Sequence, residues 1–174
     1  MIWYGLLVAA VAGERVAELV VARRNERWSA AHGATVSGQG HYPAMVALHT
    51  GLLGGCLCEV WLADRPFLPA LAWPMLALFA AAQALRWWCV STLGPRWNTR
   101  VIVVPGLPLV TGGPYRWLRH PNYVAVVAEG VALPLIHAAW VTATLFTLLN
   151  AALLTVRIRC ENRALAASTT PAAA

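Results

Sequence analysis

The residues best suited to chemistry stand together in the stretch GPYRWLRHPNY, residues 113–123, directly before an apolar run. A proline at a first helical position sacrifices no hydrogen bond, so Pro121 predicts a helix that starts there with His120 as its cap. The free N–H groups of that first turn and the positive end of the helix dipole attract an anion. Tyr115 and Tyr123 add flat surfaces and hydroxyls. The stretch therefore predicts a pocket for a ligand that carries a carboxylate and an aromatic base.

A second polar set stands at the end of the last apolar segment. Asn150, Leu154, Arg157 and Glu161 fall at i, i+4, i+7 and i+11, which is one stripe of a helix. Across the first pocket, Glu161 can hold an ammonium group. The alternative is a solvated helix end, in which Arg157 and Glu161 pair with each other. A ligand with a carboxylate, an ammonium group and an adenine describes S-adenosylmethionine, although other zwitterions satisfy the same chemistry.

Further ionisable residues stand inside apolar segments, where burial of charge is costly and usually marks function. Arg15 and Glu18 share one face of the first segment with Asn25, either as an internal salt bridge or as the lining of a polar cavity. Glu129 lies about seven residues into another segment. A pairing with Arg86 or a histidine competes there with a direct role in ligand binding.

His41, Met45 and His49 also share a helical face, at i, i+4 and i+8. No carboxylate or thiolate stands at a suitable spacing to complete a soft-metal site, so we expect no metal. The four cysteines are interpreted as small hydrophobic residues. We expect helix packing or a substrate contact on this face, and the candidate substrate-binding residues are His49, Glu129 and Asn150.

The elements that must position these residues are membrane helices. The 174-residue chain is 59% hydrophobic and only 11% charged, with a mean hydropathy of +0.60, which excludes an ordinary soluble domain. We expect an all-α integral membrane protein with about five transmembrane segments. The last two segments have about 16 and 19 residues, and 16 residues span only ~24 Å of a ~30 Å hydrocarbon core. We therefore expect them to form a short helical hairpin that is partly buried against protein and bends near Pro134. The five segments are 2–22, 42–62, 69–93, 122–137 and 138–156.

Arginines predict the orientation of these segments. All 13 basic residues are arginine, the net charge is +6, and the arginines follow apolar segments rather than forming one basic patch, which favours a membrane over nucleic acid. Only Arg65 lies between the second and third segments. The positive-inside rule then predicts an external N-terminus, with a cytosolic C-terminus, cytosolic long loops and a cytosolic cofactor pocket. The N-terminus lacks the features of a cleaved signal peptide, so it should remain as a helix. The arginine and alanine usage indicates a GC-rich genome, and hence a bacterial cell membrane.

We expect a single domain over residues 1–165. The alanine- and threonine-rich segment 166–174 is expected to be a disordered tail.

Two motifs make the chain similar to a known family. LVTGGPYRWLRHPNYVAV, followed some forty residues later by RIRCENRAL, resembles the isoprenylcysteine carboxyl methyltransferase family of integral membrane enzymes. The usual pattern is GPY-R-x-x-RHP-x-Y, then an arginine-rich helix end with two adjacent glutamates. This chain has Asn162 at the second glutamate and Ala125 where a glycine is common. The resemblance is strongest over residues 93–165.

The resemblance implies methyl transfer from S-adenosylmethionine to a lipid-tailed acceptor that enters from the bilayer. It implies cofactor contacts for His120, Pro121, Tyr123 and Glu161, to which the motif adds Gly113, Tyr115 and Arg119. Arg157 and Arg159 are the catalytic candidates, for the cofactor carboxylate or for the acceptor oxygen.

The first half of the chain is similar to one bacterial branch of that family. RVAELVVARRNERW, HGATVSGQGHYPAMVALH and RWNTRVIVVPGLPLVTGGPYR resemble methyltransferases paired with type III polyketide synthases. This similarity implies O-methylation of the ring hydroxyl of long-chain alkylpyrones or alkylresorcinols. The alternatives are methylation of isoprenylcysteine carboxylates or phospholipid amines and, in another class, a non-catalytic membrane scaffold or channel subunit. The oligomeric state stays open.

Overall fold

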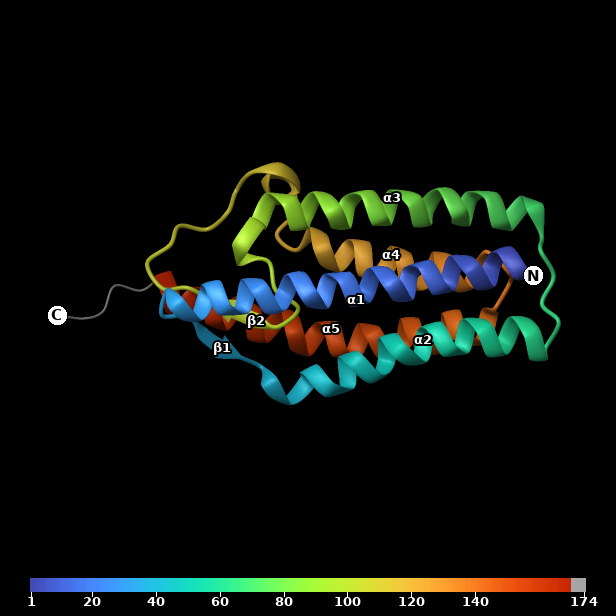
Figure 1. The fold of residues 1–174 in the computed structure, drawn as a ribbon, viewed down its shortest axis with the longest axis horizontal. Coiled ribbons are helices and arrows are strands. Elements are labelled where there is room, and N and C mark those ends of the chain that lie inside the picture. Colours follow the sequence, from blue (N-terminus) through green and yellow to red (C-terminus); the bar gives the residue numbers. More distant parts are fainter. Residues whose placement is uncertain (170–174) are drawn as a thin grey trace.

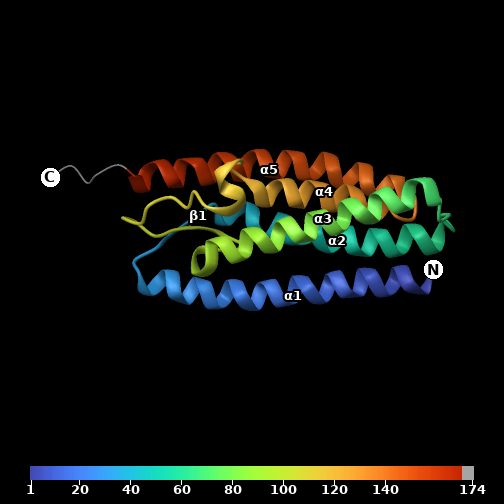
Figure 2. The same ribbon diagram turned by 90° about the horizontal axis from the view of Figure 1, so that it is seen from above.

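The structure, a computed structural model, describes residues 1–169 as a bundle of helices that run lengthwise beside one another (Figure 1). Seen from above, α1 lies along one side of the bundle and α5 along the opposite side (Figure 2). The helices in this part of the chain are α1 (Ile2–Ala31), α2 (Tyr42–Leu62), α3 (Pro69–Leu93), α4 (Pro121–Leu135) and α5 (Trp140–Thr169), with short 3₁₀ helices at Gln39–His41, Gly94–Arg96 and Gly113–Arg116.

Three stretches of helix among the described residues are long and apolar enough to cross a membrane: Gln39–Leu62, Pro69–Arg96 and Trp140–Ser168. We expected about five such segments. Near its middle, α1 carries the charged residues Glu14, Arg15 and Glu18. The 15 residues of α4 extend only ~22 Å at ~1.5 Å per residue.

Prolines define where several helices begin and where one ends. Pro69 and Pro121 occupy the first positions of α3 and α4, where the missing N–H is not needed. Pro134 lies in the last turn of α4, so the bend expected near this residue coincides with the end of the helix. Helix α5 then continues through residues 166–169, into the segment for which we expected disorder. Residues 170–174, the rest of that expected tail, lie outside the described part.

Two short strands add to the helices, which the all-α expectation missed. Strand β1 (Thr35–Ser37) follows α1, and β2 (Val101–Val103) follows α3. They pair antiparallel, with Thr35 opposite Val103. Strands of three residues are too short to leave a periodic pattern in the sequence. The pair joins the loop between α1 and α2 to the loop between α3 and α4.

The bundle has two different ends (Figure 1). The loop end contains residues 32–41 and 94–120 and the C-terminal parts of α1 and α5. The turn end contains the N-terminus and the short connections 63–68 and 136–139. The main hydrophobic core includes Tyr4, Leu133 and Ile136, and the Tyr4 hydroxyl donates to the Leu133 carbonyl at 2.9 Å near the turn end.

The close contact between α4 and α5 depends on a glycine. A Cβ atom on Gly130 would overlap the ring of Phe146 on α5. Gly130 therefore lets the two helix backbones approach, which holds the short α4 inside the bundle.

Candidate active site

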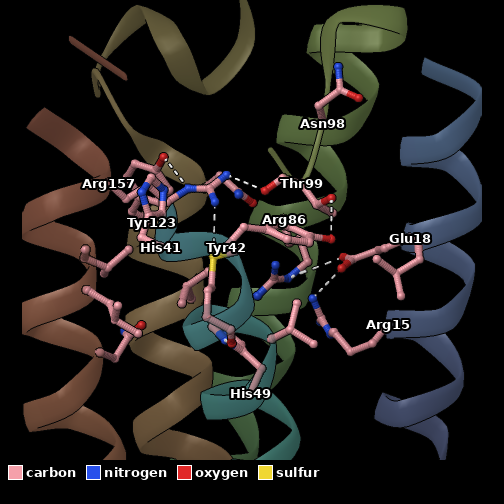
Figure 3. A pocket seen from close by; sticks show the side chains of 18 of the residues that line it. Arg15, Glu18, His41, Tyr42, His49, Arg86, Asn98, Thr99, Tyr123 and Arg157 are labelled. Atoms are coloured by element: carbon pink, nitrogen blue, oxygen red, sulfur yellow. Dashed lines mark hydrogen bonds and ion pairs between the residues drawn. The ribbon is translucent and has the colours of Figure 1, made fainter. Parts of the chain in front are cut away.

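Arg157 on α5 is the centre of a hydrogen-bond cluster at the loop end (Figure 3). Its side chain is buried, with only 7% of the residue exposed. Its Nε donates to the Tyr123 hydroxyl at 2.9 Å, and its Nη2 donates to the Thr99 carbonyl at 2.7 Å. Its Nη1 lies 3.1 Å from the sulfur of Met45. These contacts hold the guanidinium in one orientation between α2, α4 and the segment that follows α3.

Glu161 lies on the other side of the Tyr123 hydroxyl. That hydroxyl donates to the Glu161 carboxylate, so Tyr123 stands between Arg157 and Glu161. Within the described chain, Arg157 and Glu161 form no direct ion pair. The i, i+4 pair considered from the sequence is thus replaced by a bridge through a residue of α4.

His120 completes this cluster at the cap of α4. Its Nδ1 lies 3.6 Å from Glu161, its Nε2 lies 3.0 Å from the Asn162 amide oxygen, and its ring stacks on Tyr123. Hydrogen bonding to Glu161 is the main cause that raises the pKa of His120 above its ordinary value. Asn162, where the family pattern has a glutamate, therefore contacts this histidine.

Three adjoining cavities surround the cluster. An inner cavity of about 190 Å³ lies between the helices, a middle cavity of about 100 Å³ lies beside Tyr115, and an outer cavity of about 470 Å³ opens beneath loop 103–111. The outer and middle cavities share Tyr115, His120 and Glu161 as lining. The inner and middle cavities share five lining residues: Trp97, Asn98, Asn122, Tyr123 and Arg157. We call these five residues the dividing wall.

Contacts from distant helices fix the loop part of the dividing wall. The side-chain amide of Asn25 on α1 donates to the carbonyls of Gly94 and Trp97, at 3.1 and 2.7 Å. The Arg157 guanidinium holds the Thr99 carbonyl from α5. Segment 97–99 is therefore fixed from two opposite helices.

A charged network lies deeper in the bundle, below the dividing wall. Glu18 pairs with Arg15 at 2.6 Å and lies 3.7 Å from Arg86. Glu129 pairs with Arg86 and, at 3.2 Å, with Arg15. Of the alternatives left open by the sequence, the internal salt bridge and the Glu129–Arg86 pairing both occur. Arg15, Glu18 and Arg86 also line the inner cavity, whereas Glu129 does not.

Some residues singled out from the sequence belong to the scaffold. Gly113 has φ +53°, and a Cβ there would lie 3.1 Å from the Trp88 indole nitrogen and closer still to Thr92. Gly113 therefore packs against α3, and Pro121 is fully buried. Neither residue lines the three cavities. The N–H of Tyr123 is not free for an anion as we expected, because it donates to the His120 carbonyl at 3.1 Å.

The two arginine candidates on α5 are separated. Arg157 is buried in the dividing wall, whereas Arg159 is exposed and lines none of the three cavities. Arg119 is exposed but lines the outer cavity, and Tyr115 lines the outer and middle cavities. His49 and Asn150 both line the inner cavity.

Sequence reasoning missed several residues of the dividing wall. Two of them, Trp97 and Asn98, stand beside Thr99 in a loop whose position depends on contacts with α1 and α5. Asn122 lies inside the RHPNY motif, and its buried amide oxygen has no partner among the described residues. The signal that could have identified Asn122 was its polar side chain at a position between His120 and Tyr123.

Comparison with known proteins covers the same region. The model of the isoprenylcysteine carboxyl methyltransferase (ICMT) family matches residues 75–167, which include Arg157, Tyr123, His120 and Glu161 but not Met45. YpbQ, an uncharacterized protein of Bacillus subtilis (strain 168), is 41% identical over 166 residues, which cover 95% of this chain and 96% of YpbQ. No solved structure matches the chain.

Proposed function

The chain belongs to the isoprenylcysteine carboxyl methyltransferase family of membrane methyltransferases, and from that premise we propose that it O-methylates a lipid-tailed acceptor with S-adenosylmethionine. The acceptor that we propose is a long-chain alkylpyrone or alkylresorcinol, methylated at a ring hydroxyl. One observation carries the proposal. The middle cavity, toward the loops, and the inner cavity, between the helices, meet at the dividing wall, which contains Tyr123 and Arg157.

The outer and middle cavities have the chemistry that the cofactor requires. Glu161 offers a carboxylate for the ammonium group, and Arg96 and Arg119 offer cations for the carboxylate. Apolar residues of the loop end, such as Val103 and Leu107, line the outer cavity and suit the adenine. The residues present therefore fit S-adenosylmethionine.

The dividing wall has the chemistry that the acceptor oxygen requires. S-adenosylmethionine supplies an activated methyl group, so the protein has mainly to hold the oxygen in position. Arg157 stabilises negative charge on that oxygen, because its guanidinium is buried and fixed by three contacts. A phenolic acceptor has to lose its proton, and the buried Arg157 guanidinium favours that loss because it stabilises the phenolate. A pyrone enol, already ionised near neutral pH, would not need this step.

The tail of the acceptor enters between α1 and α2. Leu19 on α1 and Val46 on α2 line the inner cavity, and they are 39% and 44% exposed. These residues therefore mark where the cavity opens toward the lipid. Because ten of the 13 arginines lie at the loop end, we place that end in the cytosol, where the cofactor is, and the N-terminus outside.

Methylation of an isoprenylcysteine carboxylate is the second candidate, and the matching family favours it. The same arrangement of cavities would serve that reaction, with Arg157 facing a carboxylate. The acceptor distinguishes the two candidates. A type III polyketide synthase would be the class of enzyme that supplies the pyrone or resorcinol.

The first experiment measures cofactor binding. Purified protein in detergent should bind S-adenosylhomocysteine by calorimetry, and His120→Ala and Glu161→Ala should each weaken binding at least about tenfold, or ~1.4 kcal/mol. Arg159→Ala is the matched control and should bind normally, since Arg159 lies outside the cavities. Unchanged affinity in both site variants would refute the cofactor site.

A second experiment identifies the acceptor. Labelled S-adenosylmethionine is supplied with an alkylpyrone, an alkylresorcinol, a farnesylcysteine analogue and phosphatidylethanolamine in parallel. We expect labelling of the first two. Preferred labelling of the farnesylcysteine analogue would support the carboxyl methyltransferase alternative instead.

A further inference from the structure

The inner cavity is polar at both ends, and we infer that the acceptor carries a second oxygen, bound by Asn150 and His49, in addition to the oxygen that receives the methyl group. The inference rests on the proposed function and extends it to the shape of the head group. The first oxygen lies at the Arg157 end of the cavity. The second lies deeper, toward the charged network.

Asn150 is the main observation. It lines the inner cavity, only 3% of the residue is exposed, and its amide forms no hydrogen bond with another residue of the described chain. A buried amide without a partner is costly, so such groups usually have a ligand or water partner. The amide both donates and accepts hydrogen bonds, so it can bind a hydroxyl or a ring carbonyl.

His49 offers a second polar atom to the same cavity from the facing helix α2. Its Nδ1 lies 2.8 Å from the Met45 carbonyl, which can only accept a hydrogen bond, so Nδ1 carries the proton. In the neutral ring, Nε2 is then an acceptor. The edge-to-face contact with Phe146, with ring centroids 5.4 Å apart, holds the ring in place. His49 can therefore accept a hydrogen bond from a hydroxyl.

The charges below these two residues favour a neutral oxygen over an anion. Arg15 and Arg86 are balanced by Glu18 and Glu129, with which they form ion pairs. Glu18 Oε1 and Arg86 Nε, 3.7 Å apart, remain without hydrogen-bond partners among the described residues. This part of the cavity thus carries no excess positive charge.

The spacing along α5 suits a ring with two oxygens. Asn150 precedes Arg157 by seven residues, or ~10 Å along the helix axis. A ring with oxygens on two sides can reach both side chains through hydrogen bonds of ~3 Å. An isoprenyl chain placed in the same cavity would leave Asn150 and His49 without partners, which is unfavourable.

The test compares two acceptors that differ by one hydroxyl: a pentadecylresorcinol and the matching pentadecylphenol. Their affinities are measured by calorimetry with S-adenosylhomocysteine bound, so the result does not depend on turnover. The wild-type protein should bind the resorcinol at least about tenfold more tightly, since two hydrogen bonds contribute ~1–3 kcal/mol. In Asn150→Leu, this preference should fall to about twofold or less.

Matched variants show whether the effect belongs to the second oxygen. Thr147→Val, one turn earlier on α5, removes a hydroxyl that bonds the Ala143 carbonyl and does not line the cavity, so it should keep the preference. His49→Phe retains the ring shape and should reduce the preference even if Asn150→Leu fails to fold. Equal affinity of the two compounds in the wild type, or an unchanged preference in either inner-cavity variant that folds, would overturn the inference. If the wild-type protein does not bind S-adenosylhomocysteine, the proposed cofactor site is refuted instead.

Discussion

Glu59 and Glu161 are carboxylates on long helices at opposite ends of the bundle, and their partners differ. At the turn end, Glu59 accepts hydrogen bonds from the backbone N–H groups of Val141 and Thr142, at 3.1 and 2.7 Å, and from Arg65 at 3.0 Å. It therefore caps the first turn of α5 from a neighbouring helix. At the loop end, Glu161 contacts side chains only, Tyr123 and His120, and lines two cavities.

This difference separates polar groups whose partners lie within the fold from polar groups that face a cavity. The turn end is closed by an aromatic cluster in which His137 lies against Trp3, Tyr4 and Phe67, and the His137 Nε2 is its unpaired buried atom among the described residues. The loop end leaves polar atoms of its dividing wall unpaired, among them Trp97 Nε1 and the Asn122 amide oxygen. A carboxylate whose partners are backbone amides stabilises the fold, whereas one that faces a cavity is available to a ligand.

The largest effect is expected at the dividing wall. Arg157→Lys keeps the charge but loses the fork that contacts Tyr123 and Thr99 together. We expect kcat to fall about 100-fold, or ~2.7 kcal/mol, with S-adenosylhomocysteine affinity changed much less. Arg159→Lys, two residues further on the exposed side of α5, is the control and should stay within about twofold. A larger loss in Arg159→Lys than in Arg157→Lys would reverse the assignment.

The two glutamates test the comparison directly. Glu59→Gln should lower stability by ~1–3 kcal/mol, because it weakens the charge-assisted bonds to the Val141 and Thr142 N–H groups and to Arg65, and should leave S-adenosylhomocysteine affinity unchanged. Glu161→Gln should do the opposite, with binding weakened at least about tenfold and, at about pH 8.5, where the His120–Glu161 pairing contributes least, a thermal midpoint near that of the wild type. Thermal unfolding and calorimetry on the same preparations measure both effects. If both variants lose stability and binding to the same extent, Glu59 and Glu161 do not differ in role as the comparison expects.

A smaller effect is expected from pH. Because Glu161 raises the pKa of His120, protonated His120 stabilises the folded protein fully below its ordinary pKa of ~6.5. That contribution is lost as the pH rises through the raised pKa. The thermal midpoint of the wild type should therefore fall by a few degrees more than that of His120→Gln between about pH 6 and pH 8.5. Parallel pH profiles for the two proteins would contradict the His120–Glu161 pairing.

The sequence predicted the helices well where proline and apolar length define them. Pro69 and Pro121 start α3 and α4 as expected, and the short α4 follows from the position of Pro134. The prediction failed for the strands 35–37 and 101–103. They exist because loops 64 residues apart in the chain meet, as in the pair Ser37–Val101, which no local pattern reveals.

For the candidate site, the motif indicated His120, Tyr123 and Glu161, and the structure brings these three together. The sequence did not identify the partner of Glu129, because Arg86 and a histidine were both candidates. Only the packing of α1 and α3 around α4 places Arg15 and Arg86 against it.

By itself, the amino-acid sequence determined that this chain is a membrane protein of a methyltransferase family. Apolar length, arginine placement and the RHPNY motif are local properties that do not depend on how the helices pack. The tertiary structure alone decided which polar side chains share a cavity. Arg157 and Arg159 are alike in the sequence, but at ~100° per residue they lie ~200° apart around α5. The packing of one side of α5 against the bundle therefore buries Arg157 and leaves Arg159 exposed. Tertiary contacts also bring Asn25 and Thr99 to the site. Asn25 bonds the Trp97 carbonyl and Arg157 bonds the Thr99 carbonyl, so side chains distant in the chain hold segment 97–99 in place.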